Sequence, residues 1–356
     1  MQQPTFESVF TYANLYKSYK KCRRGVGWKH STQAYKANAF INVRKTQKEL
    51  LSGKWKSKGF IEFDIHDRGK KRHIKSVHIT ERVVQRCLCD YCLTPLLEKP
   101  LIPDNSASRS GKGMDYALNR ISDQLRWHYR RYGAEGYILT YDFHKFFESI
   151  SHDAAFSLLD RYVEDERLRE LSKYLVRMFG VKGLGLGSQV SQTLAISVPN
   201  RLDHMIKECM RCKCYGRYMD DGYIIHPDKE HLRKCAELIR KEVTAFGVEM
   251  NENKTQIIKL SRGFTFLKIK FTLTDSGRVV RKLSRANVTR ERRKLKKLAR
   301  MLPPDDLKTS YESWNGHAKR CHSYRTRKAM KEVFEKCMQI STERTTRSTE
   351  SSRRVR

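Results

Sequence analysis

The sequence predicts an α+β protein, because stretches of helical and of strand periodicity alternate along the chain. Residues 5–50 place apolar side chains at helical spacing, with Lys and Arg on the other side. The segment FIEFDIHDRGKKRHIKSVHI (60–79) alternates apolar and polar residues around a basic turn, as a β-hairpin does. A third feature is a pair of later strand-like runs that carry carboxylates at their ends.

The remaining elements follow in order along the chain. A helix is expected from about Thr80, then a loop rich in Gly, Ser and Asn (DNSASRSGKGMD), and another helix over 116–132. YILTYD reads as a buried strand, and CYGRYMDDGYIIHP reads as two strands joined by a turn that holds Met219, Asp220 and Asp221. An amphipathic helix over 228–246 precedes the strand-like GFTFLKIKFTL.

Charge is the dominant compositional feature of these 356 residues. There are 73 Lys and Arg against 39 Asp and Glu, a net charge of +34, which opposes compaction unless a polyanion neutralises it. With 15 Phe, 17 Tyr and 4 Trp the chain can still bury a sizeable core. No apolar run approaches the roughly 18 residues of a membrane span, and the polar start MQQPTFESVF lacks the plan of a secretory signal. We therefore expect a cytoplasmic protein without a membrane partner.

Ten cysteines include two CxxC pairs, Cys89/Cys92 and Cys209/Cys212. Both pairs lie in stretches that read as helix, and more than a hundred residues separate them, whereas a zinc ribbon holds its pairs on turns. Free thiols in or near a core are the favoured interpretation, with a four-cysteine zinc site as the alternative.

A strongly basic helix is expected over 284–301. It carries eight basic residues and one acidic residue, while Val288, Leu295, Leu298 and Leu302 share one face. The basic face could be solvated, but a phosphate backbone is the better partner for so many cations. We assign nucleic-acid binding to Arg290, Arg293, Lys294 and Lys297.

Three carboxylates suggest the chemistry. Asp142 ends one predicted strand, and Asp220 and Asp221 occupy the tip of a predicted hairpin 78 residues later. Mg²⁺ prefers oxygen ligands, and two such ions about 4 Å apart activate a 3′ hydroxyl and stabilise leaving pyrophosphate in nucleotidyl transfer. Mn²⁺ is a possible substitute for Mg²⁺. By itself YMDD can also be an ordinary turn, since Asp is common in turns.

The wider sequence pattern favours the metal-binding interpretation of these carboxylates over an ordinary turn. YDFHKFFESISH, GLGLGSQVSQTLAIS, YMDD, FGVEMNENKT and GFTFLKIKF resemble, in order and spacing, the A to E motifs of reverse transcriptases. RGKKRHIKSVHITERVVQR and NSASRSGKG resemble the two fingers motifs upstream, so that the likeness covers roughly residues 5–335. The resemblance implies an RNA-directed DNA polymerase.

The same resemblance implies a right-hand polymerase fold with an antiparallel palm sheet. N-terminal helices and fingers would occupy 1–130, the palm 131–274 with some fingers elements at about 155–185, and a helical thumb 275–340. SYESWNGHAKRCHSYR looks like the thumb of small bacterial and phage enzymes, with Trp314 as a packing anchor. Residues 341–356 have one apolar side chain, Val355, and are expected to form a flexible basic tail.

By resemblance, Asp142 and Asp220 are the principal metal ligands, with Asp221 beside them and the Phe143 carbonyl as a further ligand. Phe147 would be the aromatic gate that packs where a ribose 2′ hydroxyl would sit and so favours deoxynucleotides. Alternatively Phe147 is a core residue next to Phe146. We expect only one of these two rings to face the site.

The fingers motifs supply cations for the incoming triphosphate, namely Lys71, Arg72 and Arg109. Converging cations suit a tetra-anionic substrate, and Arg makes bidentate contacts to phosphate, although a solvated basic turn is the alternative for all three. Lys254 occupies the motif D position, where Lys can protonate leaving pyrophosphate. A solvated lysine after a helix is the alternative there.

Motif B departs from most reverse transcriptases, which have Gln-Gly where this chain has Leu186-Gly187, followed by Ser191-Gln192. Leu offers only shape and dispersion where Gln could hydrogen-bond, so nucleotide selection is expected to be looser. This feature is similar to the enzymes of diversity-generating retroelements, which misincorporate opposite template adenines. LGSQVSQ departs from the more usual form of the motif in those enzymes, which has Asn, Leu and Thr after the Gly. That resemblance implies a structured template RNA, nascent cDNA, deoxynucleoside triphosphates and a small basic accessory protein oligomer as partners.

Two alternatives stay open. An antiviral-defence or other small bacterial reverse transcriptase would share the palm. A catalytically idle RNA-binding protein on a polymerase fold would explain the charge and the aromatic residues equally well, but the intact carboxylates would then repel phosphate.

Overall fold

The computed structural model describes residues 3–67 and 70–354, and the side chains of 66–72 and 347–354 lie outside the described part. The chain divides into two compact, discontinuous units. Unit 1 comprises 1–117, 139–224 and 230–256, and unit 2 comprises 118–138, 225–229 and 257–356. The expected three-part division into fingers, palm and thumb stays a prediction.

Four helices open unit 1, as the periodicity of residues 5–50 predicts. The second helix begins where the Thr11 hydroxyl accepts a hydrogen bond from the backbone N–H of Asn14, a standard N-cap. Phe10, Leu15 and Tyr19 are buried. The four helices are α1 (Phe6–Val9), α2 (Tyr12–Cys22), α3 (His30–Ala37) and α4 (Ala39–Leu51).

The expected hairpin follows as the antiparallel pair β1 (Phe60–Asp67) and β2 (Lys70–Val77), in a register that pairs Phe60 with Val77. The next helical run changes from α5 (Ile79–Leu88) through a π-helical turn η1 (Cys89–Leu93) into α6 (Thr94–Glu98). Cys89 and Cys92 are buried free thiols, which confirms the expectation for that CxxC pair.

An antiparallel-rich sheet carries the carboxylates. Its four strands are β3 (Tyr137–Tyr141), β5 (Cys214–Tyr218), β6 (Asp221–His226) and β8 (Gln256–Lys259), in the order β5-β6-β3-β8. A short second pair joins β4 (Phe143–His144) to β7 (Glu249–Met250). The associated helices are α8 (Phe146–Ser149), α9 (His152–Tyr162), α10 (Glu166–Arg177), α11 (Gln189–Ser197), α12 (Asn200–His204), the π-helical η2 (Met205–Cys209) and α13 (Lys229–Thr244).

Unit 2 contains a helix, a three-stranded sheet and a bundle of three helices. Helix α7 (Met114–Tyr132) enters it at Leu118, and the sheet has the order β11-β10-β9. Strand β11 was not predicted from the sequence. Further elements are η3 (Leu260–Arg262), β9 (Phe264–Phe266), β10 (Ile269–Leu273), β11 (Val279–Leu283), α14 (Arg285–Leu298), α15 (Pro304–Ala318) and α16 (Tyr324–Arg354).

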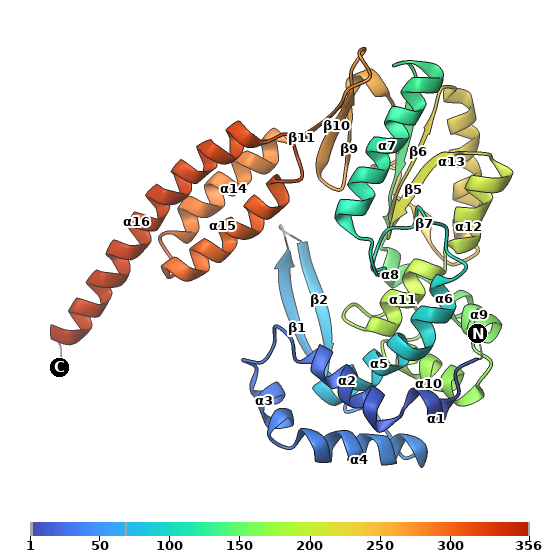
Figure 1. Cartoon of the computed structure of the whole chain (residues 1–356), viewed down its shortest axis with the longest axis vertical. Coiled ribbons are helices and arrows are strands. Elements are labelled where there is room, and N and C mark those ends of the chain that lie inside the picture. Colours follow the sequence, from blue (N-terminus) through green and yellow to red (C-terminus); the bar gives the residue numbers. More distant parts are fainter. Residues whose placement is uncertain (1–2, 68–69, 355–356) are drawn as a thin grey trace. The chain divides into compact units, whose positions relative to one another are not determined.

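The three C-terminal helices lie side by side in Figure 1 and contact one another. Leu295 is fully buried, with Val288 and Leu298 packed against the same cluster, which confirms the predicted apolar face of this basic helix. Trp314 is 7% exposed and its indole Nε1 donates to Asn287 Oδ1 at 3.1 Å, so its expected role in packing is confirmed.

The end of the chain, for which the sequence predicts a flexible basic tail from residue 341, is helical in its described part, and its flexibility stays a prediction. Helix α16 continues to Arg354. The buried Ser341 hydroxyl donates to the Leu302 carbonyl at 2.7 Å, and the Thr345 hydroxyl donates back to the Ser341 carbonyl at 2.8 Å. The Ser341 bond attaches this part of α16 to the turn after α14, whereas the Thr345 bond is an i−4 contact within the helix.

A buried ion pair organises the centre of unit 1. Arg217 on β5 and Asp203 on α12 are both fully buried, and Nε and Nη2 of the guanidinium donate to the two carboxylate oxygens at 2.8 and 2.7 Å. The guanidinium also donates to the carbonyls of Ile196 and Met219, each at 2.9 Å. Burial lowers the pKa of Arg217, but the Asp203 carboxylate more than offsets this and raises it, so the guanidinium stays charged.

None of the helices in the described part of the chain has a stretch long and apolar enough to cross a membrane.

We predict that Arg217→Met destabilises unit 1 by about 3–5 kcal/mol, because the Asp203 carboxylate would stay buried without its partner. Denaturant unfolding measures the loss. Arg126→Met is the matched control, since its ion pair with Asp123 lies on the surface and contributes about 0–1 kcal/mol. Equal losses in the two variants would contradict the prediction.

Removal of the indole of Trp314 tests the packing of the C-terminal bundle. Trp314→Ala should cost about 3–5 kcal/mol of unfolding free energy, because it leaves a cavity and an unpaired Asn287 amide oxygen. Trp28→Ala removes an exposed indole and should change stability by less than about 0.5 kcal/mol. A thermal or denaturant melt in which both variants match the wild type would contradict the assignment of Trp314 to the packing of this bundle.

Candidate active site

Asp142 lies between strands β3 and β4, where the apolar β3 sequence buries the backbone that leads to it. Its side chain is 8% exposed. The β4–β7 pair matches Phe143 with Met250, and one residue farther along, the Asn251 backbone N–H donates to the Asp142 carbonyl at 2.8 Å. The β4–β7 pairing therefore places the motif D segment, which contains Asn251, beside Asp142 of motif A.

Two side chains from the motif D segment bind the Asp142 carboxylate. Lys254 Nζ donates to Oδ2 at 2.6 Å, and Asn251 Nδ2 donates to Oδ1 at 3.3 Å. Partial burial lowers the pKa of Lys254, but its bond to Asp142 and the charges of Asp221 and Asp220 raise it overall. Asn251 was not predicted as a site residue, although it stands three positions before Lys254.

Asp220 and Asp221 lie at the expected hairpin tip. Met219 adopts a left-handed backbone conformation with φ of 56°, and its carbonyl is the one that accepts from Arg217. Asp221 then opens β6, which neighbours β3 in the sheet, so the tip comes close to Asp142.

The charges of these carboxylates act on one another. Burial, the neighbouring charges of Asp220 and Asp142, and a hydrogen bond with Asp142 raise the pKa of Asp221 to about 7. Burial and then the Asp142 charge also raise the pKa of Asp220, against the effect of a bond to its own backbone. Lys254 lowers the pKa of both carboxyls without cancelling the rise, so the cluster retains an excess of negative charge.

Close packing between β6 and β3 explains the glycine that follows YMDD. A Cβ on Gly222 would lie 2.1 Å from Cζ of the Tyr141 ring, a distance that real atoms do not reach. The Tyr141 hydroxyl lies 3.1 Å from that of Tyr215, which donates to Asp203 at 2.6 Å. Tyr141, which directly precedes Asp142, is therefore linked through Tyr215 to the buried ion pair of Asp203 and Arg217.

The two phenylalanines of motif A differ in exposure. Phe146 is buried against Phe143, with ring centroids 5.5 Å apart, whereas Phe147 is half-buried. Phe143 also packs on Tyr141 at 5.4 Å, which fixes the backbone whose carbonyl we assign to metal binding. Of the two neighbouring rings, Phe147 is the one left accessible.

Leu186 is half-buried and lines a pocket in unit 1. Gly185 beside it has no room for a side chain, because a Cβ there would lie 1.8 Å from the Phe179 ring. Gly187 is exposed, with φ of 103°. The pocket also contains two lysines that were not predicted as site residues, Lys75 on the β1–β2 hairpin and Lys182 just before motif B. Its lining residues are His73, Lys75, Glu148, Phe179, Lys182, Gly183, Leu184, Gly185 and Leu186.

The motif B segment is attached to α5 by side chains. Ser188 caps α11 and its hydroxyl donates to Gln85 Oε1 at 3.1 Å, while the Gln189 backbone N–H donates to the same oxygen at 3.2 Å. Gln85 Nε2 donates in turn to Glu81 at 3.0 Å. These bonds set the position of the chain that leaves Leu186.

Of the fingers cations expected to bind triphosphate, Arg109 is the one whose side chain the structure describes. Lys71 and Arg72 pair with His66 and Ile65 along β1–β2, but their side chains lie outside the described residues. Arg109 Nη1 donates to the carbonyls of Ile102 and Asn105 at 2.8 and 3.0 Å, and its Nε lies 3.7 Å from Glu98. These contacts assign Arg109 to holding its own loop.

On α14 in unit 2, the four basic residues assigned to nucleic-acid binding are all exposed. Their spacing along the helix places them on one face, opposite the buried Leu295 and Ala299. The residues are Arg290, Arg293, Lys294 and Lys297.

Comparisons with known proteins agree with these features. Residues 63–271, more than half of the chain, match the family model described as reverse transcriptase (RNA-dependent DNA polymerase). No curated protein matches the chain.

Among solved structures, the chain is similar to an apo telomerase from Candida tropicalis truncated from the C-terminal domain. Identity is 13% over 63% of this chain and 55% of that one, with a TM-score of 0.48. A telomerase from Candida albicans in complex with a TWJ fragment of telomeric RNA matches with 13% identity over 67% of this chain and 50% of that one, at a TM-score of 0.49.

The chain thus spans about half the length of these telomerases. The family match covers the segment that carries the three carboxylates, Lys254 and the Leu186 pocket. On that match, the chain belongs to the reverse transcriptase (RNA-dependent DNA polymerase) family.

Proposed function

We propose that this protein is an RNA-directed DNA polymerase that makes cDNA from a structured RNA template by two-metal nucleotidyl transfer. The observation that carries the proposal is the placement of Asp142, Asp220 and Asp221 at the meeting point of neighbouring strands β3 and β6. Their mutual effect on pKa favours the arrival of cations. The substrates are deoxynucleoside triphosphates.

The donor set suits Mg²⁺, and Mn²⁺ as a substitute, because carboxylate and carbonyl oxygens are the hard ligands that these ions prefer. Asp142, Asp220, Asp221 and the Phe143 carbonyl would hold two ions. When bound, such ions supply activation of the primer 3′ hydroxyl and neutralisation of the leaving pyrophosphate.

Other residues of the chain would act directly on substrate. Lys254 carries an ammonium group beside the carboxylates and holds the proton that leaving pyrophosphate requires. Phe147, whose ring is half-buried, would act as the gate that clashes with a ribose 2′ hydroxyl. Lys75 and Lys182 add positive charge to the pocket around Leu186.

Binding of the template and product rests on charge. The net charge of +34 favours association with polyanions, and the exposed face of α14 formed by Arg290, Arg293, Lys294 and Lys297 would contact phosphates.

We further propose low fidelity at template adenines, as in a diversity-generating retroelement with a small basic accessory protein oligomer. Leu186 supports this, because an apolar side chain in the pocket cannot hydrogen-bond the nucleotide or the template. An antiviral-defence role is the alternative assignment for an accurate polymerase. An idle RNA-binding protein is the alternative for a chain without activity.

Loss of one carboxylate tests the polymerase assignment. Asp220→Ala should reduce Mg²⁺-dependent extension of a DNA primer on RNA by at least about 1,000-fold, since metal-bound charge stabilisation contributes several kcal/mol. Asp153→Ala, which removes an exposed carboxylate from α9, should extend normally.

Equal extension by wild type and Asp220→Ala would contradict the two-metal assignment. If neither chain makes cDNA, triphosphate binding separates the alternatives: binding enhanced by Mg²⁺ in wild type alone supports a polymerase that needs a partner, whereas binding indifferent to Mg²⁺ indicates an idle fold.

Replacement of the pocket leucine tests fidelity. On an RNA template with isolated adenines, sequencing should show errors concentrated opposite adenine, reduced about tenfold in Leu186→Gln because one hydrogen bond contributes about 1 kcal/mol or slightly more. Leu186→Met keeps an apolar side chain of similar volume and should keep the errors. Accurate cDNA from the wild type would remove the mutagenic assignment and favour the defence role.

A further inference from the structure

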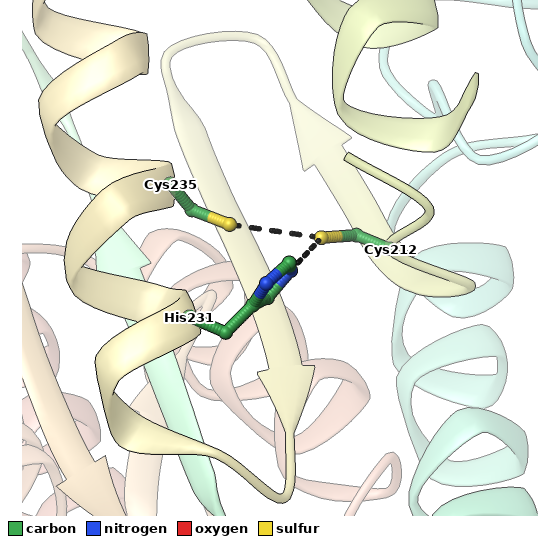
Figure 2. A group of neighbouring side chains, drawn as sticks. All are labelled: Cys212, His231 and Cys235. Carbon is green, nitrogen blue, oxygen red and sulfur yellow. Dashed lines mark hydrogen bonds between the residues drawn. The ribbon is translucent and has the colours of Figure 1, made fainter. Parts of the chain in front are cut away.

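Three side chains in unit 1 that the polymerase chemistry does not use lie close together. They are Cys212, in the turn before β5, and His231 and Cys235, one helical turn apart on the same face of α13. Figure 2 shows the three side chains pointing toward one another, with the helix on one side and the loop that carries Cys212 on the other. Cys212 and Cys235 are buried and His231 is half-buried.

Two of the three distances between the ligand atoms match those around a tetrahedral ion. Cys212 Sγ lies 3.7 Å from Cys235 Sγ and 3.4 Å from His231 Nε2, and all three ligand atoms lie within 4.8 Å of one another. For zinc–sulfur bonds of about 2.3 Å and zinc–nitrogen bonds of about 2.05 Å, tetrahedral geometry places two sulfurs about 3.8 Å apart and sulfur about 3.6 Å from nitrogen. A disulfide would instead require about 2.05 Å between the sulfurs.

The surroundings suit a soft or borderline cation held by thiolates. Two thiolates and a neutral imidazole neutralise a 2+ ion, so that no net charge is buried. Cys212 is also held in place, because its backbone N–H donates to the Ile206 carbonyl at 3.0 Å.

The position of the cluster suggests its role. Cys212 lies just before β5, and α13 follows β6, so the three ligands lie at the open end of the β5–β6 hairpin, opposite the turn that holds Asp220. We propose that Cys212, His231 and Cys235 form a structural Zn²⁺ site that joins the two ends of this hairpin, with water as the fourth ligand.

In the sequence, Cys212 stands out only as a partner of Cys209 in a CxxC motif. Cys209 is exposed at the end of η2, whereas Cys212 lies beyond the helix, contrary to the expectation that the whole CxxC stretch is helical. The two CxxC motifs are therefore not the ligand set. The informative pattern is His231 and Cys235, four positions apart on one amphipathic helix.

Co²⁺ titration of the reduced, chelator-treated full chain tests the site. The wild type should bind one Co²⁺ with the near-ultraviolet absorption of a cobalt–thiolate bond, and Zn²⁺ should displace it and raise the unfolding temperature. Cys212→Ser should weaken this binding by at least about 100-fold. Cys209→Ser, three positions away and outside the cluster, should bind as the wild type does.

Should Cys212→Ser fold poorly, His231→Gln provides the second variant, because the half-buried ring can be replaced without opening a cavity. It should keep cobalt–thiolate absorption but with at least tenfold weaker affinity. Wild-type absorption in Cys212→Ser, or a reduced wild type without such absorption, would overturn the site. The readout does not depend on primer extension, so it is independent of the proposed polymerase activity.

Discussion

The ion pair between Arg217 and Asp203 is the interaction on which the candidate active site depends. A guanidinium and a carboxylate buried together are costly to desolvate, so both need a complete set of partners. Those partners are backbone carbonyls at the end of α11 and in the turn before Asp220, and the hydroxyl of Tyr215. The backbone of Arg217 in turn exchanges hydrogen bonds with Asp104 and Ser106. One charged contact thus determines where the hairpin tip, the helix after motif B and an upstream loop lie.

The cluster of three carboxylates has a local charge opposite in sign to the net charge of the whole chain. The protein carries a large positive charge, yet three carboxylates gather where β3 and β6 meet, and burial leaves them short of compensation. Lys254 supplies part of the missing charge by bonding Asp142 directly. A local excess of negative charge inside a cationic protein can admit small divalent cations while the surrounding surface attracts nucleic acid.

The elements were predictable where one physical pattern dominates. Alternation identifies the β1–β2 hairpin, and apolar spacing identifies the buried face of α14, because each pattern repeats over many residues. Contacts between distant segments were not predictable in this way. Asn251 reaches Asp142 only through the β4–β7 pairing, and Arg109 bonds the carbonyls of its own loop, which a charge pattern cannot reveal. The helical end of α16 was missed because hydroxyl bonds such as that of Ser341, and not apolar contacts, accompany it.

Gly222 has a consequence for what position 222 can tolerate. The hydroxyl end of the Tyr141 ring lies so close to the β6 backbone at this glycine that a Cβ there would lie 2.1 Å from Cζ and 2.4 Å from the hydroxyl oxygen. The same hydroxyl lies 3.1 Å from that of Tyr215 in the interior network. A larger residue at position 222 would therefore displace the ring and, with it, the chain that leads directly to Asp142.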